Sequence, residues 1–462
     1  MTDKPNIIYL NSHDTGRWIQ PYGYPVETPN LQAFAEDAVV FRNAFCMNPT
    51  CSPSRAALLT GQSPHNSGML GLAHLGWRLN DTRQHWIHTL HDAGYTSYFT
   101  GGQHLAPGME GTKSIGYDHI LEAVGQRAWA DRAAELFAEA PEEPFYLEVG
   151  FSDCHRRRRD FPDELPADDP RWMRGPNCLP DDPRVRKEFA GFKRLARDLD
   201  ANLGVILSAL ESTGLADNTM VIITTDHGID FPRMKCTLRD DGIGVFLMMR
   251  GPRGSDWRGG QLIESMVSQI DVFPTLCDLA GCERPDWLQG SSLTPLVEGR
   301  ADEVNDAIFG EVNYHAAYQP MRCIRTRRWK YIRRFYERPT PIQPNQAPCD
   351  SRDVWEEHNW AEREQPREEL YDLVFDPGES KNLAADEEHA DVKSDLKERL
   401  RAWMNRTDDP LLQGHIPLTD GGSVVTWDEE SNHGQSMSAE EWNTWLAEND
   451  EFVGLEDAPD DY

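Results

Sequence analysis

The first half of the chain contains four short runs of apolar residues. They are residues 6–10, 96–99, 145–151 and 220–224. Uninterrupted apolar runs of this length, rich in β-branched and aromatic side chains, are typical of strands in a parallel sheet that is covered on both faces. The pattern therefore predicts four buried strands.

Helical patterns lie between these runs. Thr28 and Pro29 supply an N-cap and a proline at the first helical position. A second helix is expected to end at Gly94. A long helix, with apolar residues every three or four positions from Leu195 to Leu210, is expected to end near Gly214. The alternation predicts an α/β fold, a mixed and mostly parallel sheet with helices on both faces.

The pattern changes after about residue 300. Residues 321–335 are rich in arginine with alternating apolar positions, residues 369–374 are a further strand candidate, and residues 392–404 form an amphipathic helical pattern. We expect a small antiparallel sheet with a helix, packed on the main domain.

Three parts of the chain follow from these patterns. We assign residues 1–300 to the main α/β domain, residues 301–409 to a small C-terminal α+β subdomain, and residues 410–462 to an acidic tail with scattered tryptophans. The tail is expected to wrap the surface and to end in disorder.

Composition narrows the classes of function. The net charge of −31 disfavours nucleic-acid binding and predicts a solvated acidic surface. No run of about 18 apolar residues exists, so no membrane partner is expected. The N-terminus lacks the pattern of a secretory signal, which favours a cytoplasmic location. Nine scattered cysteines predict reduced thiols rather than a disulfide framework.

One cysteine stands in an unusual context. Residues 49–61 read PTCSPSRAALLTG, which places Cys51, Pro53 and Arg55 where a loop becomes a helix. A helix N-terminus attracts anions through its free N–H groups and its dipole. Three residues separate Cys51 from Arg55, whereas a phosphatase-type cysteine loop needs five. A cysteine near an arginine is by itself most often structural.

The whole stretch resembles the signature of the sulfatase family, within the alkaline phosphatase superfamily. The resemblance implies an alkaline-phosphatase-like fold and the oxidation of Cys51 to formylglycine by a formylglycine-generating enzyme. The hydrated aldehyde would attack sulfur with one hydroxyl group, and the other would later release sulfate.

Polar residues follow each of the four predicted strands within a few positions. Because ligands bind beyond the carboxyl ends of parallel strands, these residues are candidates for one site. They are His13 and Asp14, then His104, then Asp153 and His155, and finally Asp226 and His227.

The resemblance runs from Pro5 to about Asp409 and is greatest to the heparan N-sulfatase (sulfamidase) branch. Motifs 41–45, 67–69, 231–232 and 369–372 also carry it. It implies one divalent metal, calcium in most of the family, and a set of catalytic residues. The implied metal ligands are His13, Asp14, Cys51, Asp226 and His227. The implied catalytic residues are Cys51, Arg55, His104, His155 and Lys235.

The sequence departs from the family pattern at three places. His13-Asp14 replaces an Asp-Asp pair, and Asp226-His227 replaces Asp-Asn. Imidazole ligands favour manganese or zinc over calcium. The usual Gly-Lys-x-His is Gly101-Gly102-Gln103-His104, so a sulfate-binding lysine is missing. Lys235 or an arginine of the run 156–159 is a candidate replacement.

Further polar residues are candidates for substrate binding. Arg156 begins an arginine run directly after His155, and Glu311, Asn313 and His315 lie in the small domain. An arginine run could gather an anionic substrate, although pairing with surface carboxylates is the more common role. The other three could contact sugar hydroxyl groups or form a structural loop.

These observations predict a hydrolase of sulfate esters or sulfamates that acts on a small-molecule or oligosaccharide substrate, in particular a sulfated sugar. Two alternatives remain open. Some phosphonate monoester and phosphodiester hydrolases of the same superfamily carry the Asp-His pair, and a degenerate relative could bind sulfated glycans without catalysis.

Overall fold

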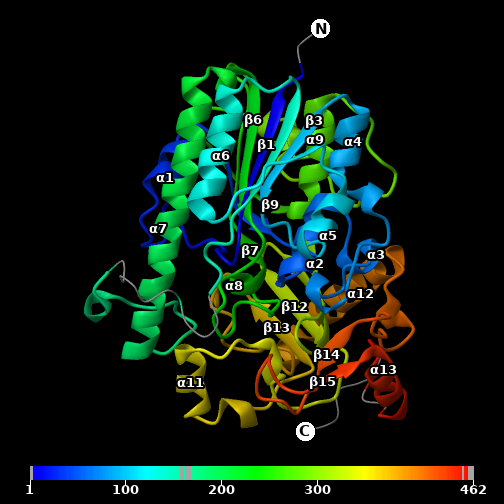
Figure 1. Ribbon diagram of the computed structural model, residues 1–462. Helices are drawn as coiled ribbons and strands as arrows, with labels where there is room; N and C mark the ends of the chain where they lie inside the picture. The colour runs from blue at the N-terminus through cyan, green and yellow to red at the C-terminus, as the bar shows by residue number, and fades with distance from the viewer. Residues whose placement is uncertain (1–3, 157–160, 162–167, 450–451, 456–462) are drawn as a thin grey trace.

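The computed structural model describes residues 4–156, 161, 168–449 and 452–455, and a nine-stranded mixed sheet forms its centre (Figure 1). β1 (Asn6–Ser12) has parallel neighbours on both sides, β5 (Phe145–Gly150) and β6 (Thr219–Thr225). The remaining strands are β2 (Val39–Phe45), β3 (Thr96–Gly101), β4 (His119–Ile120), β7 (Gly244–Val245), β8 (Leu247–Arg250) and β9 (Gln261–Ser268). The four predicted strands correspond to β1, β3, β5 and β6.

Most strand pairs in this sheet are parallel. The strand order is β4-β3-β5-β1-β6-β8-β2-β7, and β9 pairs with β2. Only β8 and β7 run antiparallel to their neighbours β6 and β2. The predicted mixed, mostly parallel sheet is confirmed.

Helices cover both faces of the sheet, as expected. α1, α6 and α7 lie on one side, and α2, α4 and α9 lie on the other (Figure 1). Alternate residues of β1 enter two separate cores: Ile8 and Leu10 face the first group of helices, and Ile7 and Tyr9 face the second. The helices are α1 (Pro29–Ala35), α2 (Cys51–Thr60), α3 (Pro64–Ser67), α4 (Trp86–Asp92), α5 (Gly108–Ile115), α6 (Gln126–Ala138), α7 (Pro183–Ser212), α8 (Asp240–Ile243), α9 (Val272–Ala280), α10 (Thr294–Val297), α11 (Asp350–Glu356), α12 (Ala390–Arg406) and α13 (Ala439–Glu448).

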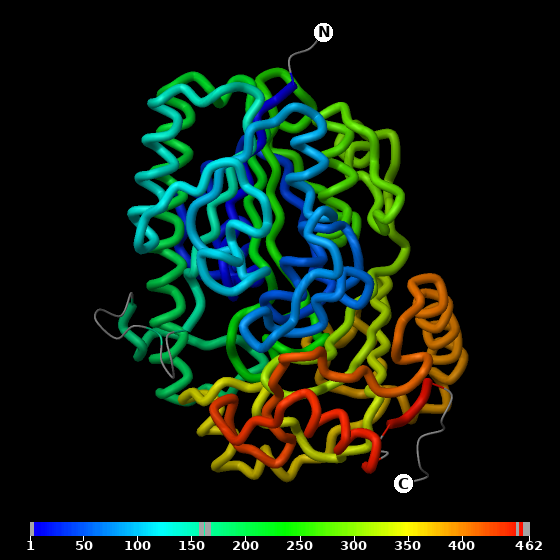
Figure 2. The backbone as a smooth tube through the Cα atoms, turned by 45° about the vertical axis from the view of Figure 1, so that its right-hand side comes forward, coloured from blue at the N-terminus to red at the C-terminus, as the bar shows by residue number. Residues whose placement is uncertain are grey.

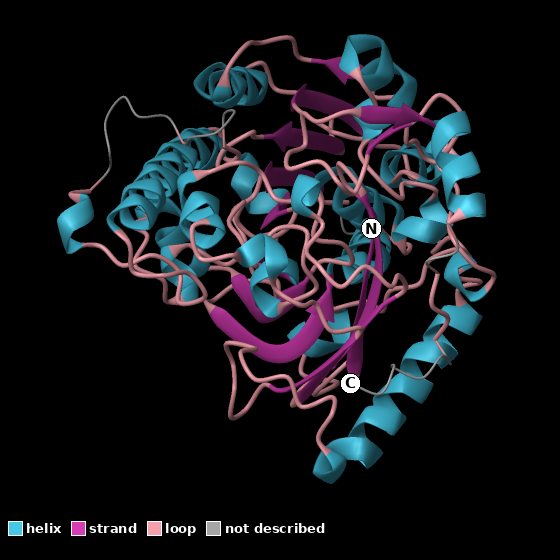
Figure 3. Ribbon diagram, turned by 90° about the horizontal axis from the view of Figure 1, so that it is seen from below, coloured by secondary structure: helices cyan, strands magenta, loops and turns pink. Residues whose placement is uncertain are grey.

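The C-terminal third forms a second sheet below the first (Figure 2). Its four strands are antiparallel, in the order β10 (Ala307–Tyr314), β11 (Tyr318–Thr326), β12 (Trp329–Arg334) and β13 (Glu368–Asp372). Seen from below, strands lie in the middle with helices around them (Figure 3). The antiparallel pairing of β10 to β13 confirms the predicted small antiparallel sheet. No helix in the described ranges is long and apolar enough to cross a bilayer.

The segment after residue 410 contributes to the core and does more than wrap the surface. It forms α13 and a two-stranded sheet of β14 (Ser423–Val425) and β15 (Ser436–Ser438). The indole of Trp427 donates to the carbonyl of Tyr318 at 2.6 Å, and that of Trp442 donates to the Tyr314 hydroxyl at 3.2 Å. Residues 456–462, predicted to be disordered, lie outside the described residues, and the boundaries at 300 and 409 stay a prediction.

A buried cluster of charged side chains joins the main domain to the small sheet. Arg322 of β11 donates two hydrogen bonds to Asp409, at 2.6 and 2.8 Å, and both side chains are fully buried. Beside them, His65 of α3 bonds to Glu311 of β10 through both its backbone N–H and its ring. The cluster ties α3 of the main domain to the small sheet and to the chain that leaves α12.

We expect Asp409→Asn to destabilise the protein, because it leaves the Arg322 guanidinium buried without a counter-charge. Breaking one partner of a buried pair costs about 3–5 kcal/mol, which corresponds to a fall of roughly 3–5 °C in the thermal midpoint of a chain of this length. Asp408→Asn is the matched control, since Asp408 is exposed. Equal midpoints for the two variants, measured by calorimetry, would contradict a stabilising role for the pair.

Candidate active site

The site lies where β1 and β6 end. Asp14 follows β1, Asp226 follows β6, and the two strands are neighbours in parallel register. Asp14 adopts a left-handed backbone conformation, with φ of 52°. Its backbone N–H donates to Asp226 Oδ1 at 2.9 Å, which holds two buried carboxylates side by side.

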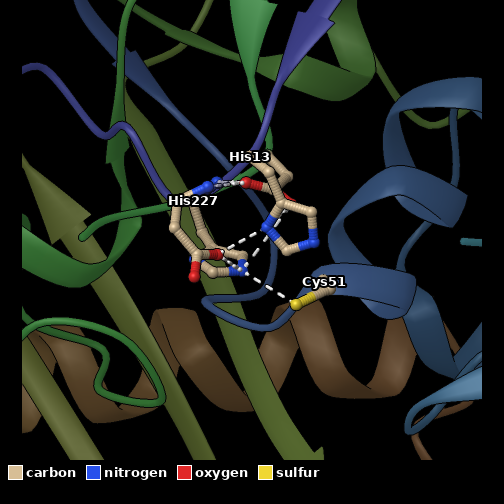
Figure 4. A group of neighbouring side chains, drawn as sticks. His13, Cys51 and His227 are labelled. Atoms are coloured by element: carbon tan, nitrogen blue, oxygen red, sulfur yellow. Dashed lines mark hydrogen bonds and ion pairs between the residues drawn. The ribbon is translucent and has the colours of Figure 1, made fainter. Parts of the chain in front are cut away.

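Five side chains predicted to bind metal converge at this point. Potential ligand atoms of His13, Asp14, Cys51, Asp226 and His227 all lie within 4.8 Å of one another, and all five residues are buried. His13 directs Nδ1 at both carboxylates, 2.7 Å from Asp14 and 3.3 Å from Asp226. Figure 4 shows His13, His227 and Cys51 around this centre. The structure therefore brings these five residues together, as the sequence predicts.

The hydrogen bonding of His227 orients its Nε2 towards the centre of the cluster. Its Nδ1 lies 2.9 Å from the carbonyl oxygen of Gly228, which can only accept, so Nδ1 carries the proton. The lone pair on Nε2 then faces Asp14 Oδ1 at 3.3 Å, Asp226 Oδ2 at 3.8 Å and Cys51 Sγ at 3.4 Å. This contact with two carboxylates is repulsive unless Nε2 is also protonated or a metal ion lies between the groups, and the donor set fits a metal ion.

The charges around the carboxylates hold them in their ionised form. Burial would raise the pKa of Asp14, but the ammonium of Lys235, 2.8 Å away, and the protonated forms of three neighbouring histidines outweigh it and hold the pKa well below its usual range. Burial likewise opposes ionisation of Asp226, whose pKa is nevertheless lowered by His13, His227 and the Arg55 guanidinium at 3.1 Å. Burial lowers the pKa of His13 to about 4, so its ring is neutral at pH 7.

Cys51 is the first residue of α2, and its thiol enters the site from the helix N-terminus. Burial raises the pKa of this thiol well above its usual range, although Lys235 acts in the opposite direction. An unmodified Cys51 is therefore protonated at neutral pH and a poor nucleophile.

Two further histidines lie on the solvent side of the cluster. His155 Nε2 is 3.8 Å from Asp14 Oδ2, and its side chain is 40 % exposed. The rings of His155 and His104 both pack edge-to-face against His13, with centroid distances of 4.5 and 4.8 Å. These two imidazoles are therefore accessible to a substrate from solvent.

The loop of residues 101–104 contains no side chain that replaces the missing lysine. A side chain at Gly102 would meet no atom within 4 Å, so space for a long residue exists. Gln103 turns away: its amide oxygen accepts from the backbone of Leu105 and Ala106, and its nitrogen donates to the Ala106 carbonyl. Lys235 is therefore the ammonium group that the structure places in the site.

Two of the residues predicted to bind substrate cannot do so directly. Arg156 is 2 % exposed and forms ion pairs with Glu188 and Asp230. Glu311 is fully buried in the cluster with His65 and Arg322. Both were chosen from local sequence, whereas their partners come from distant parts of the chain.

The other candidates differ in position. Asn313 is also fully buried and accepts from Arg322. His315 is half-buried, and burial together with the charge of Lys235 lowers its pKa to about 3. Residues 157–159 of the arginine run lie outside the described residues.

Sequence reasoning missed one member of the site, Asp230. Its carboxylate lies 3.8 Å from Lys235 and 3.6 Å from Arg156, and the residue is 5 % exposed. Asp230 thus connects the buried Arg156 to the ammonium that faces Asp14. The sequence could have identified Asp230 from its position between Asp226 and Lys235, in the same short loop.

Comparisons with known proteins agree with this geometry. Residues 5–282 match the sulfatase family, and residues 233–362 match the C-terminal domain of N-sulphoglucosamine sulphohydrolase. An ulvan-active sulfatase of Formosa agariphila is 28 % identical over 90 % of this chain and 83 % of its own. Human N-sulphoglucosamine sulphohydrolase is 28 % identical over 88 % of this chain and 91 % of its own.

Solved structures share the fold. A 2-O GAG sulfatase superposes with a TM-score of 0.69 at 22 % identity, covering 90 % of this chain and 96 % of that one. Phosphonate monoester hydrolase of Agrobacterium radiobacter gives 0.67 at 22 % identity, covering 91 % and 99 %. The family match covers more than half of the chain, and the predicted alkaline-phosphatase-like fold is confirmed. The protein belongs to the sulfatase family, the hydrolases of sulfate esters and sulfamates.

Proposed function

We propose that the protein hydrolyses the sulfate ester or sulfamate of a sulfated sugar, with Cys51 as the nucleophilic position after its oxidation to formylglycine. The observation that carries this proposal is the convergence of Cys51, at the start of α2, with two carboxylates and two imidazoles. The similarity to a sulphoglucosamine sulphohydrolase over both domains supports a sugar substrate. A formylglycine-generating enzyme would be the partner during maturation.

The residues of the site would have three roles: binding the metal, supporting the oxidised side chain and contacting the substrate. Asp14, Asp226, His227 and His13 would hold one divalent cation, whose charge would balance the sulfate and the nucleophile. Arg55, beside Asp226 and Cys51, would support the oxidised side chain. These groups are fixed by burial and mutual hydrogen bonds, so little reorganisation is needed when the substrate binds.

Lys235 and the two outer histidines would handle the substrate. Lys235 supplies an ammonium group beside Asp14, which would contact a sulfate oxygen. His155, which is exposed to solvent and directed at the cluster, would donate a proton to the departing oxygen or nitrogen. His104, whose ring packs edge-to-face with that of His13, would bind the sulfate.

The two nitrogen ligands bear on the identity of the metal. Calcium prefers a shell of oxygen atoms, whereas imidazole suits manganese or zinc. His227 Nε2 faces the centre of the cluster, in place of the amide oxygen usual in the family. We therefore propose manganese or zinc rather than calcium.

A second candidate function is hydrolysis of a phosphonate monoester or phosphodiester. The specific observation in its favour is the Asp226-His227 pair at the metal position, with the imidazole directed inward. Relative rates on an aryl sulfate and an aryl phosphonate, measured on one preparation, distinguish the two functions.

Cys51→Ala should abolish turnover and leave the fold intact, because it removes only the attacking group. We expect kcat to fall by about three orders of magnitude or more. The peptide that contains Cys51 in the active protein should be about 18 Da lighter than its sequence mass, as expected for replacement of the thiol by an aldehyde.

Cys323→Ala is the matched control, since Cys323 is equally buried but lies in the small sheet. It should keep its activity. Retention of more than about a tenth of the activity by Cys51→Ala would refute the assignment. A wild-type protein that binds sulfated glycans but never releases sulfate, even with Cys51 oxidised, would be a binding protein instead.

His227→Asn should change the metal preference, because it restores an oxygen ligand. After chelation and addition of single metals, we expect wild type to be most active with manganese or zinc, and the variant to shift towards calcium. Calorimetric metal affinities provide a second measurement. The same order of metals in both forms would show that His227 does not select the ion.

His155→Ala should slow substrates with poor leaving groups more than aryl sulfates, because an aryl oxide departs without protonation. A loss of about 10²–10⁴-fold is expected on an alkyl sulfate or sulfamate. Rates on the two substrate classes provide the measurement, with His389→Ala as the control because His389 directly precedes helix α12 of the C-terminal part. Equal losses on both classes would exclude His155 as the general acid.

A further inference from the structure

A cavity of about 790 Å³ adjoins the candidate active site. Its size falls within the range of small-molecule binding sites. The walls include Lys235 and Cys236 after β6, Met321 and Arg334 of the small sheet, and Trp360 and Arg363 after α11. Lys235 contacts Asp14, and the backbone N–H of Cys236 donates to the carbonyl of Pro49, two residues before Cys51. The cavity therefore begins at the residues that surround the reacting group.

The walls of this cavity carry an excess of positive charge. Five basic side chains line it against three carboxylates, in a protein whose net charge is −31. Glu369 is shared by Arg239 and Arg334, at 2.5 and 2.7 Å, and Glu379 pairs with Lys330 at 2.9 Å. Two of the three carboxylates are thus already neutralised, and Lys235 is itself paired with Asp14, so the unpaired positive charge belongs to arginines.

Two arginines remain without a carboxylate partner in the part of the chain that the structure describes. The Arg233 guanidinium donates to the carbonyl oxygens of Gly378 and Glu379, at 3.3 and 2.6 Å, and forms no ion pair with a described carboxylate. Arg363 is exposed and forms no ion pair with a described residue. Guanidinium groups in this state suit bidentate contacts to a carboxylate or a sulfate.

Aromatic side chains form another part of the wall. Trp355 and Trp360 are half-buried, with ring centroids 5.9 Å apart, and the guanidinium of Arg352 supports the Trp360 ring from 5.6 Å. Rigid aromatic faces beside polar groups give an amphipathic ligand a large contact area at low entropic cost. A pyranose ring has this character, with apolar C–H faces and a polar edge.

We propose that the cavity binds the sugar next to the one that bears the scissile sulfate, and that this second sugar is anionic. Arg363 and Arg233 contact its carboxylate or sulfate, and Trp360 packs against its ring. The substrate is then an anionic oligosaccharide rather than a sulfated monosaccharide. The inference rests on the proposed function, because it places the scissile sulfate at Cys51.

The test compares two substrates that share the same terminal group. One is glucosamine N-sulfate, and the other is a tetrasaccharide that begins with the same sugar and alternates it with uronic acid. For Arg363→Ala and Trp360→Ala, kcat/KM on the tetrasaccharide should fall at least about tenfold, as expected for the loss of a good contact. On the monosaccharide it should stay within twofold. Arg300→Ala, an exposed arginine outside the cavity, should leave both values unchanged.

Modified tetrasaccharides identify the anionic group. If Arg363 binds the carboxylate, reduction of the uronic acid to the neutral sugar should remove the difference between wild type and Arg363→Ala. If it binds a sulfate, the difference should persist after reduction and disappear after selective desulfation. Equal losses on mono- and tetrasaccharide, or no loss on either, would overturn the proposal.

Binding without turnover separates this proposal from the proposed function. In the Cys51→Ala background, Trp360→Ala should weaken calorimetric binding of the tetrasaccharide at least about tenfold. Unchanged affinity would overturn the second-sugar site, whatever the activity. Absence of sulfate release from both substrates by wild type, together with weakened binding in Trp360→Ala, would refute the hydrolytic function and leave the site standing.

Discussion

Two buried carboxylates lie side by side at the centre of this protein, and the surrounding residues compensate their charge. Asp14 and Asp226 share a hydrogen bond through the Asp14 backbone and have almost no exposure to solvent. Such a pair is unstable unless cations approach closely, because both burial and mutual repulsion favour protonation. Lys235 lies against one carboxylate and Arg55 against the other. The imidazole lone pair of His227 leaves one further position, which a divalent metal ion fits.

The parallel sheet and one helix place most of these groups, and the loop after β6 adds Lys235. β1 lies between β5 and β6, so the residues that follow these strands meet at one edge. The left-handed conformation of Asp14 turns its backbone N–H towards the neighbouring strand end. α2 then presents Cys51 from its N-terminus, where the positive end of the helix dipole faces the anionic substrate. A sulfate at this point meets the helix, the metal position and Lys235 together.

The sequence predicted those parts of the site that depend on local pattern. Buried strands are recognisable as apolar runs, and the residues after them therefore gathered as expected. β2 and β8 were missed, because β2 carries Arg42 and Asn43 within its run and its pairing with β8 is antiparallel over a long separation. Arg156 and Glu311 were misassigned for a related reason. Their partners, Glu188 and His65, lie 32 and 246 positions away, so a polar residue destined for a buried pair looks the same in sequence as one that faces a substrate.

Overall charge and local charge act in opposite directions on the substrate. A surface with a net charge of −31 repels a polyanion, yet at physiological ionic strength this repulsion is screened beyond about 8 Å. Long-range attraction therefore cannot bring a sulfated sugar to this protein, and affinity must come from contacts made after entry. Those contacts are strongest where water is excluded and arginines lack carboxylate partners. The excess of basic side chains around the cavity beside Lys235, on a molecule that is acidic elsewhere, meets this requirement. The same distribution favours selectivity, since an anion that cannot fill the cavity gains no attraction from the rest of the surface.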